Sequence, residues 1–365
     1  MAEDDQRNRY DSTRLEAWVT RIFAGYGLDD RDAATISSML LYADLRGIRS
    51  HGIQRVKMYD DNIRTAHPDF HSRPDVVFET PVSAVLDGRN GMGQLVGRFG
   101  MDTAIEKART SGVGLVSVRN SGHYGTAGYY VNMAAEAGLI GFSMTNSRPA
   151  AAPTWSSVPY LGTNPIAVGV PADPHPFLFD AATTTVPAGK VEVYGKLGKQ
   201  LPDGWAVDGQ GHPMHDPAGT LSMILNDNEG GLTPLGGGTE TTGGHKGYGF
   251  GMIVELFTGI LSQGNTSHEV MASGAPKGIC HAFAAIDPAI FGDAAALKSR
   301  FSAFLEELRA LPAIPGHRVY VQGDKEAESV SGMRASGIPV SQKTLDELVS
   351  ISHRLGIDPA EYVTI

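Results

Sequence analysis

The chain is organised around the stretch Asp44-Leu45-Arg46-Gly47-Ile48-Arg49-Ser50-His51-Gly52-Ile53-Gln54-Arg55. A helical pattern breaks at Gly47, and a serine, a histidine and an arginine then follow within six residues. An imidazole can exchange a proton near neutral pH, a neighbouring hydroxyl can orient it, and a guanidinium can hold a carboxylate through two parallel hydrogen bonds. Taken alone, the Ser-His-Gly tripeptide is better explained by an ordinary turn, because short motifs are weak evidence.

The composition is that of a globular protein rather than a nucleic-acid-binding one. The 365 residues (38.7 kDa) are 41% hydrophobic and 19% charged, which is enough for a large core in roughly two or three subdomains. The net charge of −10 and the lack of a Lys/Arg-rich run argue against nucleic acid as a partner.

The cysteine content and the apolar runs predict a cytoplasmic protein without a membrane span. Cys280 is the only cysteine, which excludes an intrachain disulfide and fits a reducing compartment. The acidic start, Met1–Gln6, lacks the pattern of a signal peptide. The longest apolar-rich run, Tyr248–Leu261, carries Glu255 and is too short to cross a bilayer.

The first 65 or so residues are predicted to be helical. Thr13–Glu16 has the spacing of a capping box, and the apolar residues that follow fall on one helical face until Gly27. A second helix starts at Asp29 or Asp30, and a third is expected around Ile53–Ile63. Ser50 and His51 would therefore lie at a junction between helices.

A glycine-rich segment after the first predicted strands has two interpretations. Strands are expected at Val76–Glu79 and Val82–Asp87, and Gly91–Gly97 then precedes a helix around Gln94–Arg109. This order resembles a dinucleotide-binding loop, but the next strand, Gly114–Val118, ends in Arg119-Asn120 where a Rossmann fold needs an acidic residue. Arg119 would suit a phosphorylated ribose, so the Rossmann interpretation stays open beside the favoured one, a glycine-rich start of a helix.

Polar clusters follow several predicted strands in the middle of the chain, where sites are usually built. A glycine-rich turn at Asn120–Gly128 leads into a helix at Tyr129–Ala137, and the strand Ile140–Thr145 ends in Asn146–Pro149. The strand Phe177–Asp180 is followed by a polar run.

The last third of the chain adds a low-complexity segment and an apolar helix. Glu229–Gly244 is either a flexible linker or a lid. The apolar stripe Met252–Ile260 that follows it is predicted to be core. A helix at Ala294–Arg309, a strand at Arg318–Gln322 and a helix at Leu345–Leu355 complete the prediction.

Taken together, these motifs resemble the type-2 malate/L-lactate dehydrogenase family of oxidoreductases, which includes malate, lactate, sulfolactate and ureidoglycolate dehydrogenases and cyclic imino-acid reductases. The matching segments run in the family's order across nearly the whole chain, so the resemblance is strong although each motif alone is weak. They are Ala43–Gly47, Ser50–Gly52 with Arg55, Ser121–Gly125, Met144–Ser147, Leu161–Pro165, Asp180–Thr183, Gly189-Lys190, Pro202–Ala206 and Lys246–Gly249.

The resemblance implies an α/β (α+β) fold that is not Rossmann. Family members bind a nicotinamide cofactor on a mainly antiparallel central sheet, which here would span 71–314 with 229–244 as a Gly-rich loop. A helical substrate domain would combine 1–70 with 315–365. Gly91–Gly97 would then be only the start of a helix, and the protein would be a homodimer.

The resemblance also implies roles for individual residues. His51 would donate a proton to the substrate carbonyl oxygen with Ser50 orienting it, and Arg55 would bind the substrate carboxylate. Thr163 would touch substrate, and His123 is either a cofactor contact or the alternative acid/base residue. The cofactor would be lined by Ser121, Gly122, His123, Tyr124, Asp180, Ala181, Ala182, Lys246, Gln322, Gly323 and Asp324.

Two positions depart from the family pattern. Lys190 stands where the imino-acid reductases carry an aspartate, and a lysine there is common in members that act on hydroxy acids. Lys190 is therefore a candidate catalytic residue that polarises the oxygen or lowers a histidine pKa through like-charge repulsion. Gln322-Gly323 replaces the usual Pro-Gly, which leaves that cofactor contact open.

The expected reaction is hydride transfer between NAD or NADP and a small 2-hydroxy or 2-oxo acid, either malate/oxaloacetate or L-lactate/pyruvate. Positioning and proton transfer are the protein's tasks in this reaction, and the hydride chemistry belongs to the cofactor. No metal site is predicted. The alternatives are an NADPH-dependent cyclic imino-acid reductase, an inactive binding protein, and a metal-dependent lyase or hydrolase of small carboxylates. The last would use His51, His123, His212 and His215 as ligands.

Overall fold

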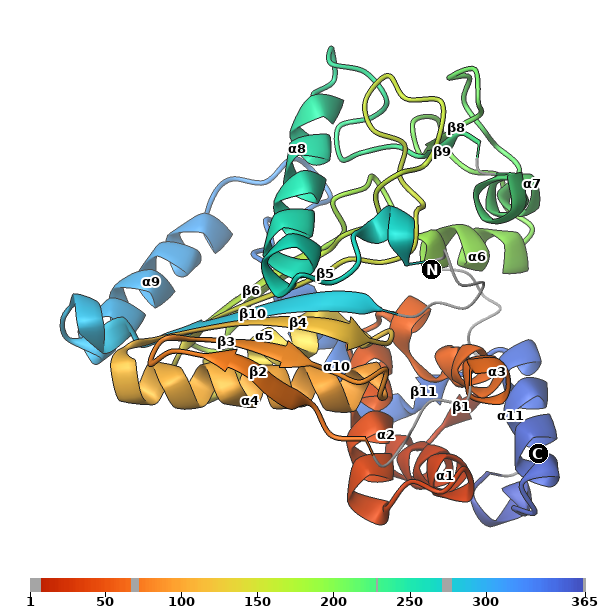
Figure 1. The fold of residues 1–365 in the computed structure, drawn as a ribbon, viewed down its shortest axis with the longest axis horizontal. Helices are drawn as coiled ribbons and strands as arrows, with labels where there is room; N and C mark the ends of the chain where they lie inside the picture. The colour runs from red at the N-terminus through yellow and green to blue at the C-terminus, as the bar shows by residue number, and fades with distance from the viewer. Residues whose placement is uncertain (1–7, 67–71, 228, 271–277, 364–365) are drawn as a thin grey trace.

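The computed structural model describes residues 8–66, 72–227, 229–270 and 278–363. A central sheet lies between a helical unit that contains both ends of the described chain and a loop-rich lobe on the opposite side of the sheet (Figure 1). Within the described residues, no helix is long and apolar enough to cross a membrane.

The central sheet is mixed but mainly antiparallel. Among the described residues it has seven strands in the order β2-β3-β4-β10-β5-β6-β7, in which only β3 and β4 run parallel. The strands are β2 (Asp75–Glu79), β3 (Ser83–Asp87), β4 (Val113–Ser121), β5 (Ile140–Thr145), β6 (Ile166–Val170), β7 (Phe177–Ala181) and β10 (Ile279–Ile286).

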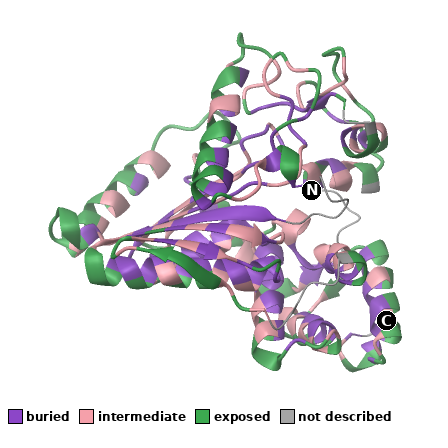
Figure 2. Cartoon of the chain, in the orientation of Figure 1, coloured by how far each residue is buried: buried purple, intermediate pink, exposed green. Residues whose placement is uncertain are grey.

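Helices cover both faces of this sheet. The helices α4 (Gly93–Ser111) and α5 (Ala127–Glu136) pack on one face, around a core that includes Leu86, Tyr130 and Phe283. The helix α8 (Gly244–Glu255) continues as the π-helical turn η5 (Leu256–Ile260), which packs against β4 and β10 on the other face. The central strand β10 is buried along most of its length (Figure 2).

The helical unit is built from both ends of the chain. One hydrophobic core joins Trp18 and Ile36 from the N-terminal helices to Leu348 and Ile351 near the C-terminus, and β1 pairs with β11. Its elements are β1 (Arg9–Tyr10), α1 (Ser12–Gly25), α2 (Asp30–Leu45), η2 (Arg49–His51), η3 (Ile53–Arg55), α3 (Val56–Ala66), α10 (Asp324–Ser336), β11 (Ile338–Pro339), α11 (Gln342–Arg354) and η8 (Pro359–Glu361).

The loop-rich lobe has a small core of its own around Val191, Leu201 and Leu232. Its elements are α6 (Ala188–Lys196), β8 (Ala206–Val207), α7 (Pro217–Ser222), η4 (Met223–Asp227) and β9 (Gly231–Leu232). Three further elements lie outside it, namely η6 (Ser267–Glu269), η7 (Pro288–Phe291) and α9 (Ala294–Arg309).

The predicted non-Rossmann α/β fold is confirmed, and the glycine-rich segment Gly91–Gly97 serves packing. A Cβ on Gly93 would lie 2.3 Å from the carbonyl oxygen of Gly122, so only glycine lets α4 start against the turn at 122–123. Arg119 is not a free phosphate ligand, because its Nε bonds Asp87 Oδ2 at 3.1 Å.

Four predictions about local structure are wrong. Residues 318–322, predicted as a strand, form none. The helix α1 is capped by Asp11, whose side chain accepts from the Arg14 amide, rather than by the Thr13–Glu16 box. The segment 229–244 is not simply a flexible linker, because Leu232 is fully buried in the paired strand β9. The stripe Met252–Ile260 is not core, since Met252, Ile253, Leu256, Phe257 and Ile260 are all between 41% and 55% exposed.

Candidate active site

The turn that carries Ser50 and His51 is built on a buried carboxyl group. Asp44, 5% exposed at the end of α2, accepts a hydrogen bond from the Ile53 amide at 2.7 Å through Oδ2. A Cβ on Gly52 would lie 1.9 Å from Asp44 Oδ1. Position 52 therefore needs glycine for space, although its backbone angles are ordinary. This packing explains why glycine follows the Ser-His pair.

Two histidines from distant parts of the chain lie side by side. The rings of His51 and His123 are stacked, with centroids 5.8 Å apart and planes 18° from parallel. The Ser50 hydroxyl lies 2.9 Å from His51 Nδ1, and the Tyr59 hydroxyl lies 2.7 Å from His123 Nδ1. Each imidazole is thus held by a hydroxyl at Nδ1, which leaves Nε2 as the nitrogen that can face a ligand.

Burial keeps both imidazoles neutral. It lowers the pKa of His51 from 6.5 to about 3, and the charge of Arg55 adds to the effect. Burial also lowers the pKa of His123 well below 6.5, with smaller contributions from His51 and Arg55. A neutral imidazole can accept a proton from a hydroxyl group, so either ring is suited to act as a general base. A carboxylate bound beside the rings would raise both pKa values and favour their protonated forms.

Arg55 faces the same space as the histidines. Its Nε donates to the Ser50 carbonyl oxygen at 2.6 Å, and its Nη1 lies 3.1 Å from Glu192 Oε2. A Cβ on Gly189 would come within 2.5 Å of Arg55 Nη2, so glycine lets the start of α6 approach the guanidinium. The predicted carboxylate-binding residue therefore already holds a carboxylate, that of Glu192.

Lys190 lies beside this group without a hydrogen bond to it. Its Nζ sits 5.1 Å from the centroid of the Trp205 ring, and the residue is exposed. In the part of the chain that the structure describes, no hydrogen bond joins Lys190 to Ser50, His51 or His123.

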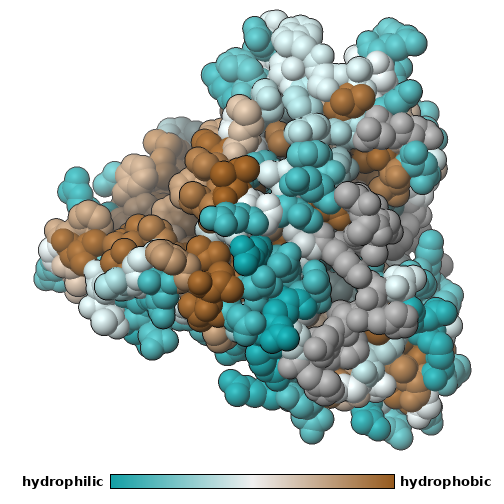
Figure 3. Space-filling model, viewed as in Figure 1, coloured by the Kyte–Doolittle hydropathy of each residue, from teal (hydrophilic) through white to brown (hydrophobic). Residues whose placement is uncertain are grey.

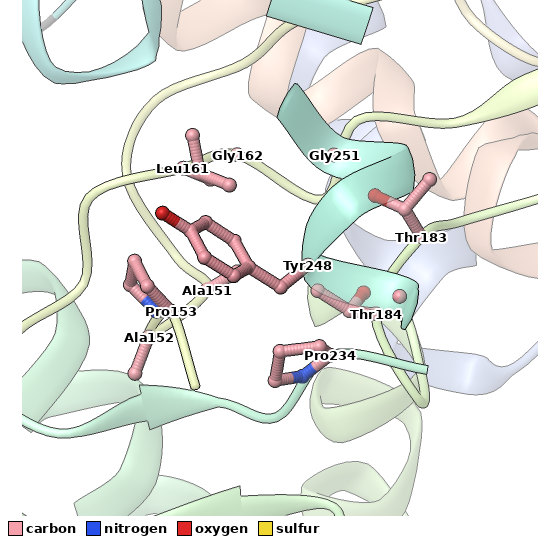
Figure 4. Close-up of a pocket in the computed structure, with 11 residues that line it drawn as sticks. Ala151, Ala152, Pro153, Leu161, Gly162, Thr183, Thr184, Pro234, Tyr248 and Gly251 are labelled. Atoms are coloured by element: carbon pink, nitrogen blue, oxygen red, sulfur yellow. The ribbon is translucent and has the colours of Figure 1, made fainter. Parts of the chain in front are cut away.

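Thr163 is held in place through its backbone. Its amide donates to Ser147 Oγ at 3.3 Å, and its carbonyl oxygen accepts from the Thr183 amide at 3.0 Å. A cavity of about 10 Å³ lies nearby, with Tyr248 and Thr183 among the residues around it (Figure 4). That volume is about what one water molecule needs, so this cavity is too small for a substrate.

Two of the predicted cofactor residues have structural side chains. Ser121 Oγ lies 2.8 Å from Nε2 of the fully buried His281, and the Tyr124 hydroxyl lies 3.0 Å from Ser143 Oγ. Both residues are 1% exposed. These two side chains hold the turn that carries Gly122 and His123. Because both are buried and already hydrogen-bonded, only the backbone of Ser121 and Tyr124 could contact a ligand.

Two of the other predicted cofactor segments, Asp180–Ala182 and Gln322–Asp324, meet at the β7 edge of the sheet. Asp180 Oδ2 accepts from Thr126 Oγ1 at 2.6 Å and from the Gly128 amide at 2.7 Å, which ties it to the start of α5. Ala181 and Ala182 follow it and are partly exposed.

The C-terminal segment reaches the same edge. The Gln322 carbonyl oxygen accepts from the Leu178 amide at 3.2 Å, and Gly323 starts α10 with φ +101°. Asp324 is occupied, because it pairs with Arg309 and with His175. Lys246 is exposed in the first turn of α8.

Tyr59 and Glu192 were missed by sequence reasoning. Tyr59 lies four residues after Arg55, and positions four apart share one face of a helix, so the spacing could have indicated it. No sequence signal connects Glu192 with Arg55, because 137 positions separate them.

The proposed metal ligands are not assembled. His212 lies against Asp208, and His215 lies against Asp203. Among the residues that the structure describes, no group of three or more His, Cys, Asp or Glu side chains could hold a metal ion. The donor set of a metal-dependent lyase is therefore missing from this part of the chain.

Asp44 is expected to make folding stability depend on pH. Burial raises its pKa from 3.8 to about 7. Between these values the folded chain binds more protons than the unfolded one, so stability falls as the pH rises, by up to about 1.4 kcal/mol per pH unit. Asp44→Asn mimics the protonated form, and its unfolding free energy in urea should decline less between pH 5 and 7. Parallel curves for the wild type and the variant would contradict this assignment.

Comparison with known proteins identifies the class. The profile of the malate/L-lactate dehydrogenase family matches residues 10–349. The chain is 42% identical over 360 residues to the malate dehydrogenase of Pyrococcus abyssi, with 98% of each chain covered. It is 32% identical over 343 residues to the malate/(S)-sulfolactate dehydrogenase of Methanothermus fervidus, covering 93% of this chain and 96% of that one. The crystal structure of malate dehydrogenase from Entamoeba histolytica superposes with a TM-score of 0.93 at 36% identity, covering 96% and 99% of the two chains.

The fold and these relatives show that the chain is an oxidoreductase, of the class of dehydrogenases that act on hydroxy acids. It belongs to the malate/L-lactate dehydrogenase family.

Proposed function

We propose that the protein oxidises malate to oxaloacetate, and catalyses the reverse reaction, with a nicotinamide cofactor. The observation that carries this proposal is the grouping of two stacked imidazoles beside Arg55, a guanidinium that already holds a carboxylate. Malate is chosen over lactate because the relatives from Pyrococcus abyssi and Entamoeba histolytica are named malate dehydrogenases.

The roles proposed for the side chains follow from their contacts. Arg55 binds the carboxylate next to the reacting carbon through its two Nη atoms, after Nη1 has released Glu192. His51 accepts the hydroxyl proton of the 2-hydroxy acid, and Ser50 holds the ring through Nδ1. His123 packs against His51, and Tyr59 fixes its orientation. Lys190 needs a rotation away from Trp205 to reach the same substrate.

The residues present fit a nicotinamide dinucleotide. Gly125 has φ +85°, and a Cβ there would meet nothing within 4 Å. Gly122 and His123 are the partly exposed residues of the turn 121–125, so the turn offers its backbone to a ligand there. The proposed contacts are the backbone of 121–124, Asp180–Ala182, Lys246 and Gln322–Asp324. When bound, the nicotinamide ring supplies or accepts the hydride.

NAD is the proposed form of the cofactor. Arg119, the arginine that sequence reasoning associated with a phosphorylated ribose, is paired with Asp87 and also donates to the Ser262 carbonyl oxygen. Its Nε and Nη1 are therefore occupied, and the Rossmann arrangement that would set Arg119 beside the ribose is not the fold of this chain.

A substrate panel tests the proposal directly. Purified protein is assayed with NADH and with NADPH against oxaloacetate, pyruvate and a cyclic imine, with and without a chelator. We expect NADH oxidation with oxaloacetate to be fastest and to survive chelation. Activity on the imine alone would indicate the imino-acid reductase, and activity lost to the chelator would indicate the metal-dependent enzyme.

The exposed apolar face of α8 supports a homodimer. Met252, Ile253, Leu256, Phe257 and Ile260 recur at helical spacing on one face. Figure 3 shows apolar surface over α8 and also over β2, where Phe78 is 60% exposed. Apolar surface of this kind marks an interaction site on a protein. We propose that a second copy of the chain covers it, in the cytoplasm, where Cys280 would remain reduced.

The double change Leu256→Glu and Ile260→Glu is expected to yield a monomer, because two carboxylates would be buried without partners in the interface. Sedimentation velocity at low micromolar concentration measures the effect. The control is Ile314→Glu, a charge placed on a residue that is 71% exposed elsewhere, which should leave the dimer intact. A monomeric wild type, or a dimeric double variant, would contradict the proposal.

A further inference from the structure

Arg148 is a half-buried cation close to the candidate site, and it has no part in the proposed function. It lies three residues beyond the end of β5, directly after Ser147, whose hydroxyl holds the Thr163 amide. The charges of Glu192 and Arg55 both act on its guanidinium. In the described part of the chain, the Arg148 guanidinium has no hydrogen bond. Partial burial without a hydrogen-bonded partner is costly for a charged group, so the Arg148 guanidinium is available to an anionic ligand.

Glu192 shows where a carboxylate fits beside Arg55. Its carboxylate lies 3.1 Å from Arg55 Nη1, and its charge also reaches Arg148. Arg55 is held at Nε by Ser50. A substrate carboxylate that binds through Nη1 and Nη2 must therefore displace Glu192. The Glu192 side chain is 33% exposed, so it can move into solvent at little cost.

We infer that Arg148 is the specificity-determining residue of the site and binds a second, distal carboxylate of the substrate. The inference rests on the proposed function and deepens it, because it selects four-carbon dicarboxylic 2-hydroxy acids over monocarboxylic ones. Arg55 binds the carboxylate next to the reacting carbon, and Arg148 binds the far end of the molecule.

The charges at the site favour two carboxylates once Glu192 has left. Arg55 and Arg148 then contribute two positive charges, and the neutral histidines contribute none. A dicarboxylate neutralises both guanidiniums, whereas a monocarboxylate leaves Arg148 half-buried and unpaired. Sites built for a charged substrate group discriminate strongly against analogues that lack it, because the partner is then left without a bond.

The test compares oxaloacetate with pyruvate in wild type and in Arg148→Met. The variant should lose about 30- to 100-fold in kcat/KM for oxaloacetate, mostly through KM, and change by less than about threefold for pyruvate. Arg148→Lys should recover part of the loss, because it restores the charge without the planar fork. Arg98→Met, which removes an exposed arginine of α4, should leave the ratio unchanged.

The outcomes separate the inference from the function. A wild type that reduces no 2-oxo acid overturns the proposed function. An active wild type whose Arg148→Met variant loses the same factor on both substrates overturns the inference alone. If the variant does not fold, the wild type is assayed with the 4-methyl ester of oxaloacetate, which lacks the distal charge. A kcat/KM for the ester at least about 30-fold below that for oxaloacetate is expected, and equal values would overturn the role of Arg148.

Discussion

His51→Gln is expected to lower kcat by about 10²- to 10⁴-fold while KM for malate changes by less than about threefold. That range is the usual contribution of a positioned general acid or base. Glutamine keeps a polar side chain of similar size but cannot exchange a proton. Ser50 links His51 to Arg55, the proposed carboxylate-binding residue, because its hydroxyl lies 2.9 Å from His51 Nδ1 and its carbonyl oxygen accepts from Arg55 Nε. Steady-state kinetics in the direction of malate oxidation measure the loss.

His123→Gln is the matched comparison, because both rings share the stack and both are bonded to a hydroxyl at Nδ1. We expect a smaller kcat loss there than at His51. A larger loss at His123 would reverse the two roles, and full activity of His51→Gln at saturating substrate would remove His51 from the chemistry. His245→Gln controls for histidine loss, since His245 is exposed at the start of α8.

Arg55→Met is expected to raise KM for oxaloacetate and malate by about 100-fold or more. Loss of one partner from a buried, hydrogen-bonded charge pair costs about 2–5 kcal/mol, and each 1.4 kcal/mol is a factor of ten. The methionine also leaves Glu192 without its cation, so the substrate would meet an unpaired negative charge. Initial rates over a wide substrate range separate KM from kcat.

Two further variants frame that result. Arg64→Met removes an exposed arginine from α3 and should change KM by less than about twofold. Glu192→Gln should act in the opposite direction and lower KM a few-fold, because it removes the internal competitor for Arg55. An unchanged KM in Arg55→Met would show that the carboxylate binds elsewhere.

Much of the fold could be predicted from local patterns. The helix at 294–309 has the predicted bounds, and α2 begins after Asp29 as its capping chemistry indicated. Prediction failed where contacts between residues distant in sequence determine the secondary structure. The central strand β10 was missed, and its sequence Ile-Cys-His-Ala-Phe-Ala-Ala-Ile is rich in small residues. It becomes a strand because β4 and β5 pair with it on both sides.

The apolar stripe on α8 and η5 is a second case in which the sequence pattern did not determine the environment of the residues. Helical periodicity indicates which residues share a face, and it did so correctly. It does not indicate whether the covering partner is the same chain, since burial depends on what packs against the face. The stripe was assigned to the core, whereas the structure leaves it exposed.

The sequence by itself determined the local structure of Asp44–Arg55, because the residues that contact one another there are close along the chain. Ser50 and His51 are adjacent, and Asp44 and the Ile53 amide that bonds it are nine positions apart. Only the tertiary structure decided what that stretch faces. It brings His123 and Tyr59 together, sets Glu192 on Arg55 and places Arg148 within reach of both charges. The hydrogen-bonded partners among them are 64 positions apart (Tyr59 and His123) and 137 positions apart (Arg55 and Glu192). Sequence spacing cannot predict such contacts, because they form only when the sheet and α6 pack together.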